Sequence, residues 1–236
     1  GHLYFRIGFA VARQDFVKAR SAFEEAYQED IQLAILHGAT PAEAPQRAAN
    51  SSAYVALVIL ERIDDADFAD AKEKGQFLDR LFRPSFDAAI RNQIENPEAI
   101  SKALTAIVPS DGQATCRALY VELQQVNAVA LPFATIWATG DVLESVLLGY
   151  LFYGRKITTV VGKDILTVEL GSLYKEAERL AIFPSQSVAA ACNLIYIFRN
   201  RIHPGNEMRQ KYKLTQRTAR TMKNLLDRAL IEWHTA

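Results

Sequence analysis

The segment 188–198, with the sequence Val-Ala-Ala-Ala-Cys-Asn-Leu-Ile-Tyr-Ile-Phe, limits what this chain can fold into more than any other stretch. Wound into a helix, it carries apolar side chains nearly all the way round, which is typical of a helix that is buried on several sides. One amphipathic neighbour cannot cover such a surface. The segment therefore predicts a core in which this helix packs against more than one other element.

The rest of the chain also has the composition of a helical protein. Its 236 residues include 35 Ala but only 11 Gly and 8 Pro, so the best helix former is abundant and the residues that interrupt helices are scarce. Apolar side chains recur at three- and four-residue steps. We expect an all-α protein, with helices near residues 12–38, 40–63, 76–94, 96–108, 113–136, 142–153, 167–182, 185–202 and 215–233.

The turn-forming sequence Pro109-Ser110-Asp111-Gly112 is the clearest boundary in the chain. It predicts two parts. Residues 1–110 form a helical N-terminal region to which the sequence assigns no role, and residues 111–236 form a helical bundle.

The most apolar long stretch, residues 128–153, is interrupted by Pro132 and by Thr139-Gly140-Asp141. We therefore predict two core helices that meet at a turn. Neither reaches the roughly 20 residues that a membrane-spanning helix needs, so no membrane association is expected. The β-branched run 156–161 has no obvious partner strand, and we expect it to be an extended loop.

The charges are balanced in total but not along the chain. Lys and Arg number 27 and Asp and Glu number 27, so the net charge gives no argument for binding nucleic acid or membranes. From residue 199 onward, however, there are nine Lys or Arg and three Asp or Glu, a net charge of +6, and the first 198 residues carry −6. This basic C-terminal segment either binds an anion or is an ordinary solvated helix face.

Sequence signatures of several kinds of site are missing. Cys116 and Cys192 have no CxxC pattern and no His at ligand spacing, which argues against a zinc site or a disulfide framework. We expect them to be buried free thiols in a reducing cytoplasm. The chain has no GxGxxG after a strand, no P-loop, no GxSxG and no HExxH. We therefore expect no cofactor and no metal.

The apolar helix predicted at 185–202 ends in the sequence Arg199-Asn200-Arg201-Ile202-His203-Pro204. Arg199 and His203 are four residues apart, so they share one face of a helix. Proline disfavours helical geometry in the preceding residue, which places His203 at the helix C-terminus, where the helix dipole favours imidazolium and the two arginines oppose it. Such a group can transfer protons near neutral pH. Alternatively, these polar residues only cap the last carbonyl groups of the helix.

Four segments of the chain, residues 140–148, 170–177, 182–184 and 198–205, together resemble the HEPN-like helical proteins of bacteria and archaea. The resemblance covers about residues 112–234 and rests mainly on the Arg-Asn-x-x-His-Pro element. It implies an antiparallel helical bundle that dimerises through the motif helix. It also implies a role in toxin-antitoxin, phage-defence or RNA-processing systems, whose active members cut RNA without metal by attack of the 2′-hydroxyl on the adjacent phosphate.

By this resemblance, Arg199 binds the scissile phosphate, His203 is the general acid or base, and Asn200 holds the geometry of the motif. Glu144 is the acid that accompanies the motif from a neighbouring helix, although it also fits a capping box over residues 141–144. Basic residues near the motif and on the last helix are expected to bind nucleic acid: Arg201, Arg209, Lys211, Lys213, Arg217 and Arg220.

The sequence therefore predicts a protein that binds RNA or cleaves it without metal. The predicted partners are a second copy of the chain and, as a further option, another protein. The alternative is a non-catalytic helical protein that serves dimerisation or interaction. Only three residues separate Arg199 from His203, fewer than in the active relatives, and this departure supports a binding-only or scaffold role at least as well as cleavage.

Overall fold

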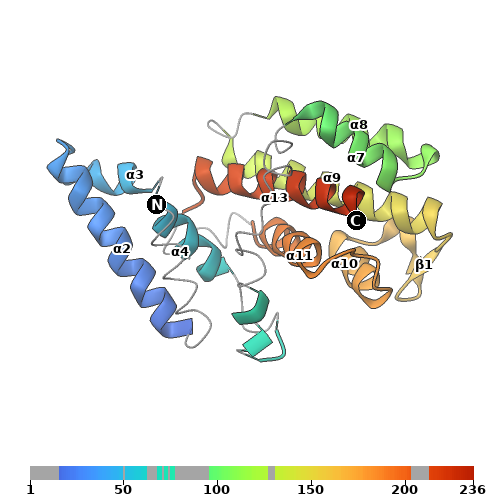
Figure 1. Ribbon diagram of the computed structural model, residues 1–236, viewed down its shortest axis with the longest axis horizontal. Helices are drawn as coiled ribbons and strands as arrows, with labels where there is room; N and C mark the ends of the chain where they lie inside the picture. Colours follow the sequence, from blue (N-terminus) through green and yellow to red (C-terminus); the bar gives the residue numbers. More distant parts are fainter. Residues whose placement is uncertain are drawn as a thin grey trace. The chain divides into compact units, whose positions relative to one another are not determined.

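The computed structural model describes residues 16–49, 51–62, 68–70, 72–73, 75–77, 96–126, 131–202 and 213–236, with only the backbone given for residues 16–19, 52 and 201. Regular structure in these ranges is almost entirely helical (Figure 1), which confirms the all-α prediction. The chain divides into two compact units. One comprises residues 1–83 and 203–218, and the other comprises residues 84–202 and 219–236.

The first unit contains the helices α2 (Phe16–Leu36), α3 (Ala44–Ala48) and α4 (Ser52–Arg62). Both α3 and α4 pack on α2. Helix α2 ends where the sequence predicts, because Gly38 adopts a positive φ of 86° that other residues rarely take. Within this unit, the Tyr27 hydroxyl donates a hydrogen bond to the carbonyl of Pro45.

The single helix expected at 40–63 is in fact two helices. The Thr40 hydroxyl accepts from the Glu43 N–H and the Glu43 carboxylate accepts from the Thr40 N–H, as in a capping box. Residues 41–43 nevertheless form a turn, and the helix begins only at Ala44. The helix then stops after Ala48. A new one begins because the Ser51 hydroxyl accepts from the backbone N–H of Tyr54 and so caps α4.

The second unit contains most of the remaining elements. Its helices are α7 (Pro97–Ile107), α8 (Ser110–Gln125), α9 (Pro132–Gly149), α10 (Leu170–Arg179), α11 (Gln186–Arg201) and the larger part of α13 (Gln216–Thr235). Shorter elements lie between α9 and α10: the π-helical turn η2 (Tyr150–Gly154), the strands β1 (Thr159–Val160) and β2 (Lys163–Asp164), and the 3₁₀ turn η3 (Ile165–Thr167).

Helix α9 contacts α8, α10 and α11, and α7 runs alongside α8 (Figure 1). This pairing of α7 with α8 buries Ile100, Ala103, Leu104 and Ile107. Helix α7 therefore belongs to the same compact unit as α8, although it precedes the turn sequence at residues 109–112.

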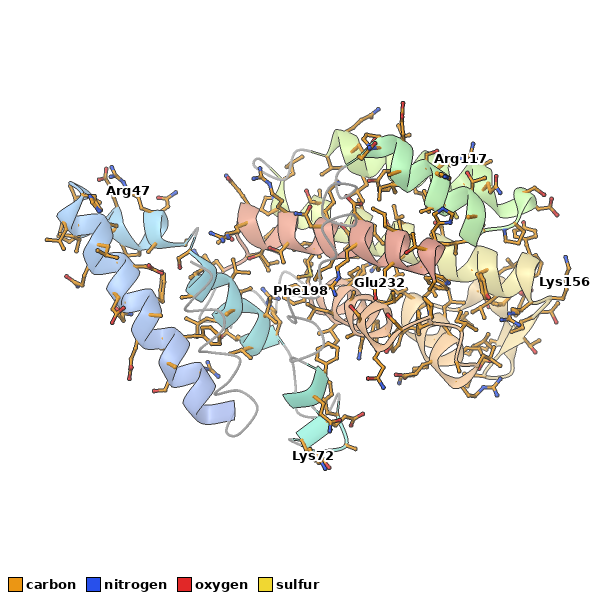
Figure 2. The ribbon with its side chains drawn as sticks, in the orientation of Figure 1. Arg47, Lys72, Arg117, Lys156, Phe198 and Glu232 are labelled. Carbon is orange, nitrogen blue, oxygen red and sulfur yellow. The ribbon has the colours of Figure 1, made fainter. Side chains whose placement is uncertain are left out.

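Helix α11 is buried as its sequence predicts. Leu194, Ile195 and Phe198 are fully inaccessible to water, and Phe198 is labelled in Figure 2. The Ser185 hydroxyl caps the start of α11 by accepting from the Val188 N–H, and it donates in turn to the carboxylate of Glu232 on α13. One chain therefore buries these apolar side chains without a second copy.

The turn predicted at Thr139-Gly140-Asp141 is wrong, because α9 continues through these residues. The two core helices are separated earlier, between Gln125 and Pro132. Thr139 is buried within the helix, and its hydroxyl is satisfied by donating to the carbonyl of Thr135 at 2.7 Å. The helix also tolerates Gly140, whose missing side chain makes room for a neighbouring helix, as described below.

The loop expected at 156–161 contains a short strand that does have a partner. Thr159 pairs with Asp164 and Val160 with Lys163 in an antiparallel hairpin. Its two-residue turn is Val161-Gly162, with φ values of 50° and 71°, which match the turn that best joins twisted strands. Lys156 precedes this hairpin at the edge of the unit (Figure 2).

Cys116 and Cys192 are free and buried, as predicted. Burial raises the pKa of both thiols, most strongly that of Cys192. In the part of the chain that the structure describes, we find no helix that is both long and apolar enough to cross a membrane.

Candidate functional site

Arg199 lies near the C-terminal end of α11 and is held by two residues of α9. Its guanidinium carbon lies 3.7 Å from the centre of the Trp137 ring, a close cation–π contact. Its Nη2 donates to the Oδ1 of Asp141 at 3.2 Å. The Arg199 side chain remains 20% exposed and the Asp141 side chain 35% exposed, so the ion pair is partly open to water.

Gly140 allows Arg199 to reach this position. A Cβ atom built on Gly140 would lie 2.3 Å from the Cγ of Arg199 and 2.9 Å from both its Cβ and its Cδ. Non-bonded carbon atoms do not approach so closely. The aliphatic stem of Arg199 therefore lies against the backbone of α9, and any larger residue at 140 would force Arg199 to move.

Glu144 is one helical turn beyond Gly140 on α9, and it lies near enough to Arg199 to interact with its charge. Burial raises the pKa of its carboxyl group, and the nearby carboxylates of Asp141 and Glu169 raise it further. The charge of Arg199 and a hydrogen bond from the backbone N–H of Leu170 act in the opposite direction. The alternative reading of residues 141–144 as a capping box is wrong, because all four lie inside α9.

Two carboxyl groups of α9 interact with the Arg199 guanidinium. Asp141 forms an ion pair with it, and Glu144 lies close enough to be affected by its charge. Asp141 is the carboxylate that is hydrogen-bonded to Arg199, so an anion that approaches the guanidinium competes with Asp141 directly.

Only part of the hydrogen-bonding capacity of Arg199 is used. A guanidinium has five N–H donors, of which one is committed to Asp141. The Nε of Arg199 is buried, with no hydrogen-bond partner in the described residues. The donors that remain on the two terminal nitrogens can meet a ligand from the exposed side.

The other predicted motif residues are placed only in part. Asn200 is exposed near the end of α11. His203, Arg209 and Lys211 lie outside the described residues, as does the side chain of Arg201. The structure thus brings Arg199 and Glu144 together and gives no position for the proposed proton-transfer group.

The basic C-terminal segment divides into internal and exposed positions. Lys223 donates to the buried carboxylate of Asp227, which also accepts from the Tyr120 hydroxyl. Arg228 is itself buried, bonds Ser187 and pairs with Glu232. The side chains of the predicted nucleic-acid-binding residues Lys213, Arg217 and Arg220 are exposed.

Sequence reasoning missed Trp137, Gly140 and Asp141 as site residues. A signal was present, since residues 137, 140, 141 and 144 follow the three- and four-residue spacing that places side chains on one helix face. Interpreting Gly140-Asp141 as a turn concealed it. A continuous helix is needed before these positions come into line.

Among the described residues, no three His, Cys, Asp or Glu side chains lie close enough together to hold a metal ion. Comparison of the chain with protein-family models, with curated proteins and with solved structures finds no match. Any function must therefore be argued from the residues themselves.

Proposed function

We propose that this protein is a HEPN-like protein of a bacterial defence or toxin-antitoxin system that binds RNA at Arg199 or cleaves it without metal through Arg199 and His203. The observation that carries the proposal is the arrangement of Arg199, whose partly exposed guanidinium is held between the Trp137 ring and the Asp141 carboxylate. A guanidinium fixed in this way has lost much of its conformational freedom before a ligand arrives.

Phosphate is the anion that such a group suits. The terminal nitrogens of Arg199 can offer a fork of N–H donors to two phosphate oxygens, and the charge strengthens these hydrogen bonds. Asp141 occupies one donor and would be partly displaced by the ligand. The Asp141 side chain is 35% exposed, so water can hydrate its carboxylate when the ligand displaces it from Arg199.

The proposed reaction needs two proton transfers and no redox step. The 2′-oxygen of RNA forms a bond to phosphorus while the bond from phosphorus to the 5′-oxygen breaks. One proton leaves the 2′-hydroxyl and another reaches the 5′-oxygen. His203 is proposed for one of these transfers, since imidazole exchanges protons near neutral pH.

RNA binding is tested by fluorescence anisotropy with labelled RNA at low salt. Arg199→Ala should weaken binding, and Arg199→Lys should restore only part of it, because a point charge does not reproduce the fork. Arg179→Ala is the matched control. It removes one exposed positive charge from α10, where Arg179 pairs with Glu176. Arg217→Ala and Arg220→Ala should weaken binding in a way that depends on salt.

Cleavage is tested by following the length of the same RNA over time. His203→Ala should slow cleavage by about 10²- to 10⁴-fold, the usual contribution of a proton-transfer group. A chelator should leave the rate unchanged. If the protein neither retains nor cuts RNA at low salt, the proposal is refuted.

A second candidate is a non-catalytic interaction protein, and one observation favours it. The contacts of Arg199 with Trp137, Gly140 and Asp141 join α11 to α9 and would stabilise the bundle with no ligand present. On this reading, Arg199→Ala lowers the melting temperature and changes nothing else. Sedimentation of the unmodified protein then tests the homodimer prediction directly.

A further inference from the structure

Trp137 is the most unusual side chain of the site, because 45% of it is exposed. Trp137 lies in α9, and the two residues that precede it, Thr135 and Ile136, are buried. One face of its indole is covered by the guanidinium of Arg199 at 3.7 Å. The exposed area therefore includes ring surface that the guanidinium does not cover.

The ring is also held in place. The stacked guanidinium fixes one face of Trp137, and Arg199 is itself fixed by Asp141 and by the glycine at residue 140. Such an aromatic surface is ordered in advance, so a ligand that stacks on it loses little conformational entropy of the protein. Aromatic rings held next to cations are typical surfaces for nucleobases in proteins that bind single strands.

We propose that Trp137 stacks an unpaired nucleobase of the RNA whose phosphate binds Arg199, so that the ligand is single-stranded RNA. This inference rests on the proposed function and names its substrate class. The guanidinium is stacked on one face of the indole, so the rest of the ring is left for a base, while the exposed donors of Arg199 take a phosphate of the same strand. A base inside a duplex is covered on both faces and cannot stack on Trp137, whereas an unpaired base has a free face.

The sharpest test changes the RNA and leaves the protein intact. A short oligoadenylate is compared with versions in which one abasic nucleotide, which keeps the phosphates and lacks the base, is moved along the strand. At one position the loss should weaken binding by about fivefold or more, the effect of removing one stacked base. A duplex of the same sequence should bind more weakly than the single strand.

A second set of measurements assigns the effect to Trp137. In Trp137→Leu the penalty for the abasic nucleotide should fall close to zero, whereas Trp137→Phe should keep part of it. Arg199→Lys should weaken all the RNAs and retain the penalty, because the ring is still present. Trp233→Phe, which alters the other tryptophan of the chain, should leave the penalty unchanged.

The outcomes separate this inference from the function on which it depends. If RNA binds through Arg199 but no abasic position matters, or if Trp137→Leu keeps the full penalty, stacking on Trp137 is refuted and the RNA-binding proposal stands. If no RNA binds to the unmodified protein or if Arg199→Ala binds as tightly, the proposed function fails and this inference fails with it.

Discussion

Gly140→Ala should destabilise the protein, although the same change stabilises an ordinary helix. Alanine is better than glycine in a helix interior by about 1 kcal/mol. Here, however, the new Cβ would meet the Cγ of Arg199 at 2.3 Å and its Cβ and Cδ at 2.9 Å. These atoms belong to the stem of the side chain, so the whole of Arg199 must move. Overpacking of this kind costs about 1–3 kcal/mol, and we expect a net loss of about 1 kcal/mol.

A double-mutant cycle tests whether the destabilisation by Gly140→Ala comes from Arg199. The free energy of unfolding of each variant is measured by urea denaturation, with circular dichroism as the signal. Arg199→Ala removes two of the three crowded atoms, so Gly140→Ala should become more favourable in that background by about 1–2 kcal/mol. Gly154→Ala is the control, because its new Cβ would meet nothing closer than 3.4 Å. If Gly140→Ala stabilises the protein as Gly154→Ala does, with or without Arg199, then Arg199 does not lie against α9 as described.

Three further predictions concern the same unit. Because the pKa of Glu144 is raised in the folded state, the stability that Glu144 contributes is complete at acidic pH and is lost as pH rises through the folded-state pKa. Glu144→Gln should therefore flatten the fall of melting temperature with rising pH. A melting temperature that depends on pH in the same way in the variant would contradict this prediction. Asp227→Asn leaves Lys223 and Tyr120 without their carboxylate and should lower the free energy of unfolding by about 1–3 kcal/mol in urea denaturation. An unchanged free energy would show that these two bonds to Asp227 contribute nothing to stability. Phe198→Ala should cost about 3–5 kcal/mol in the same assay, because Phe198 is fully buried, and a cost below that of an exposed-site variant would refute its place in the core.

The sequence by itself determined most of the helices and several of their ends. Asn96 accepts from the backbone N–H of Glu98, Ser185 accepts from that of Val188, and Gly38 ends α2 with a positive φ. These features depend on hydrogen bonds and conformational preferences between residues a few positions apart. The apolar sequence of α11 likewise required burial, whatever covered it.

Only the tertiary structure decided how residues 139–141 behave and which groups surround Arg199. The local cost of glycine in a helix is small enough for packing to reverse the prediction of a turn, and here the space at Gly140 is filled by Arg199. Asp141 and Arg199 are 58 residues apart, and nothing in either segment alone selects the other. Trp137, Asp141 and Arg199 therefore became a site only once α9 was continuous and packed against α11, because side-chain contacts across helices depend on that packing.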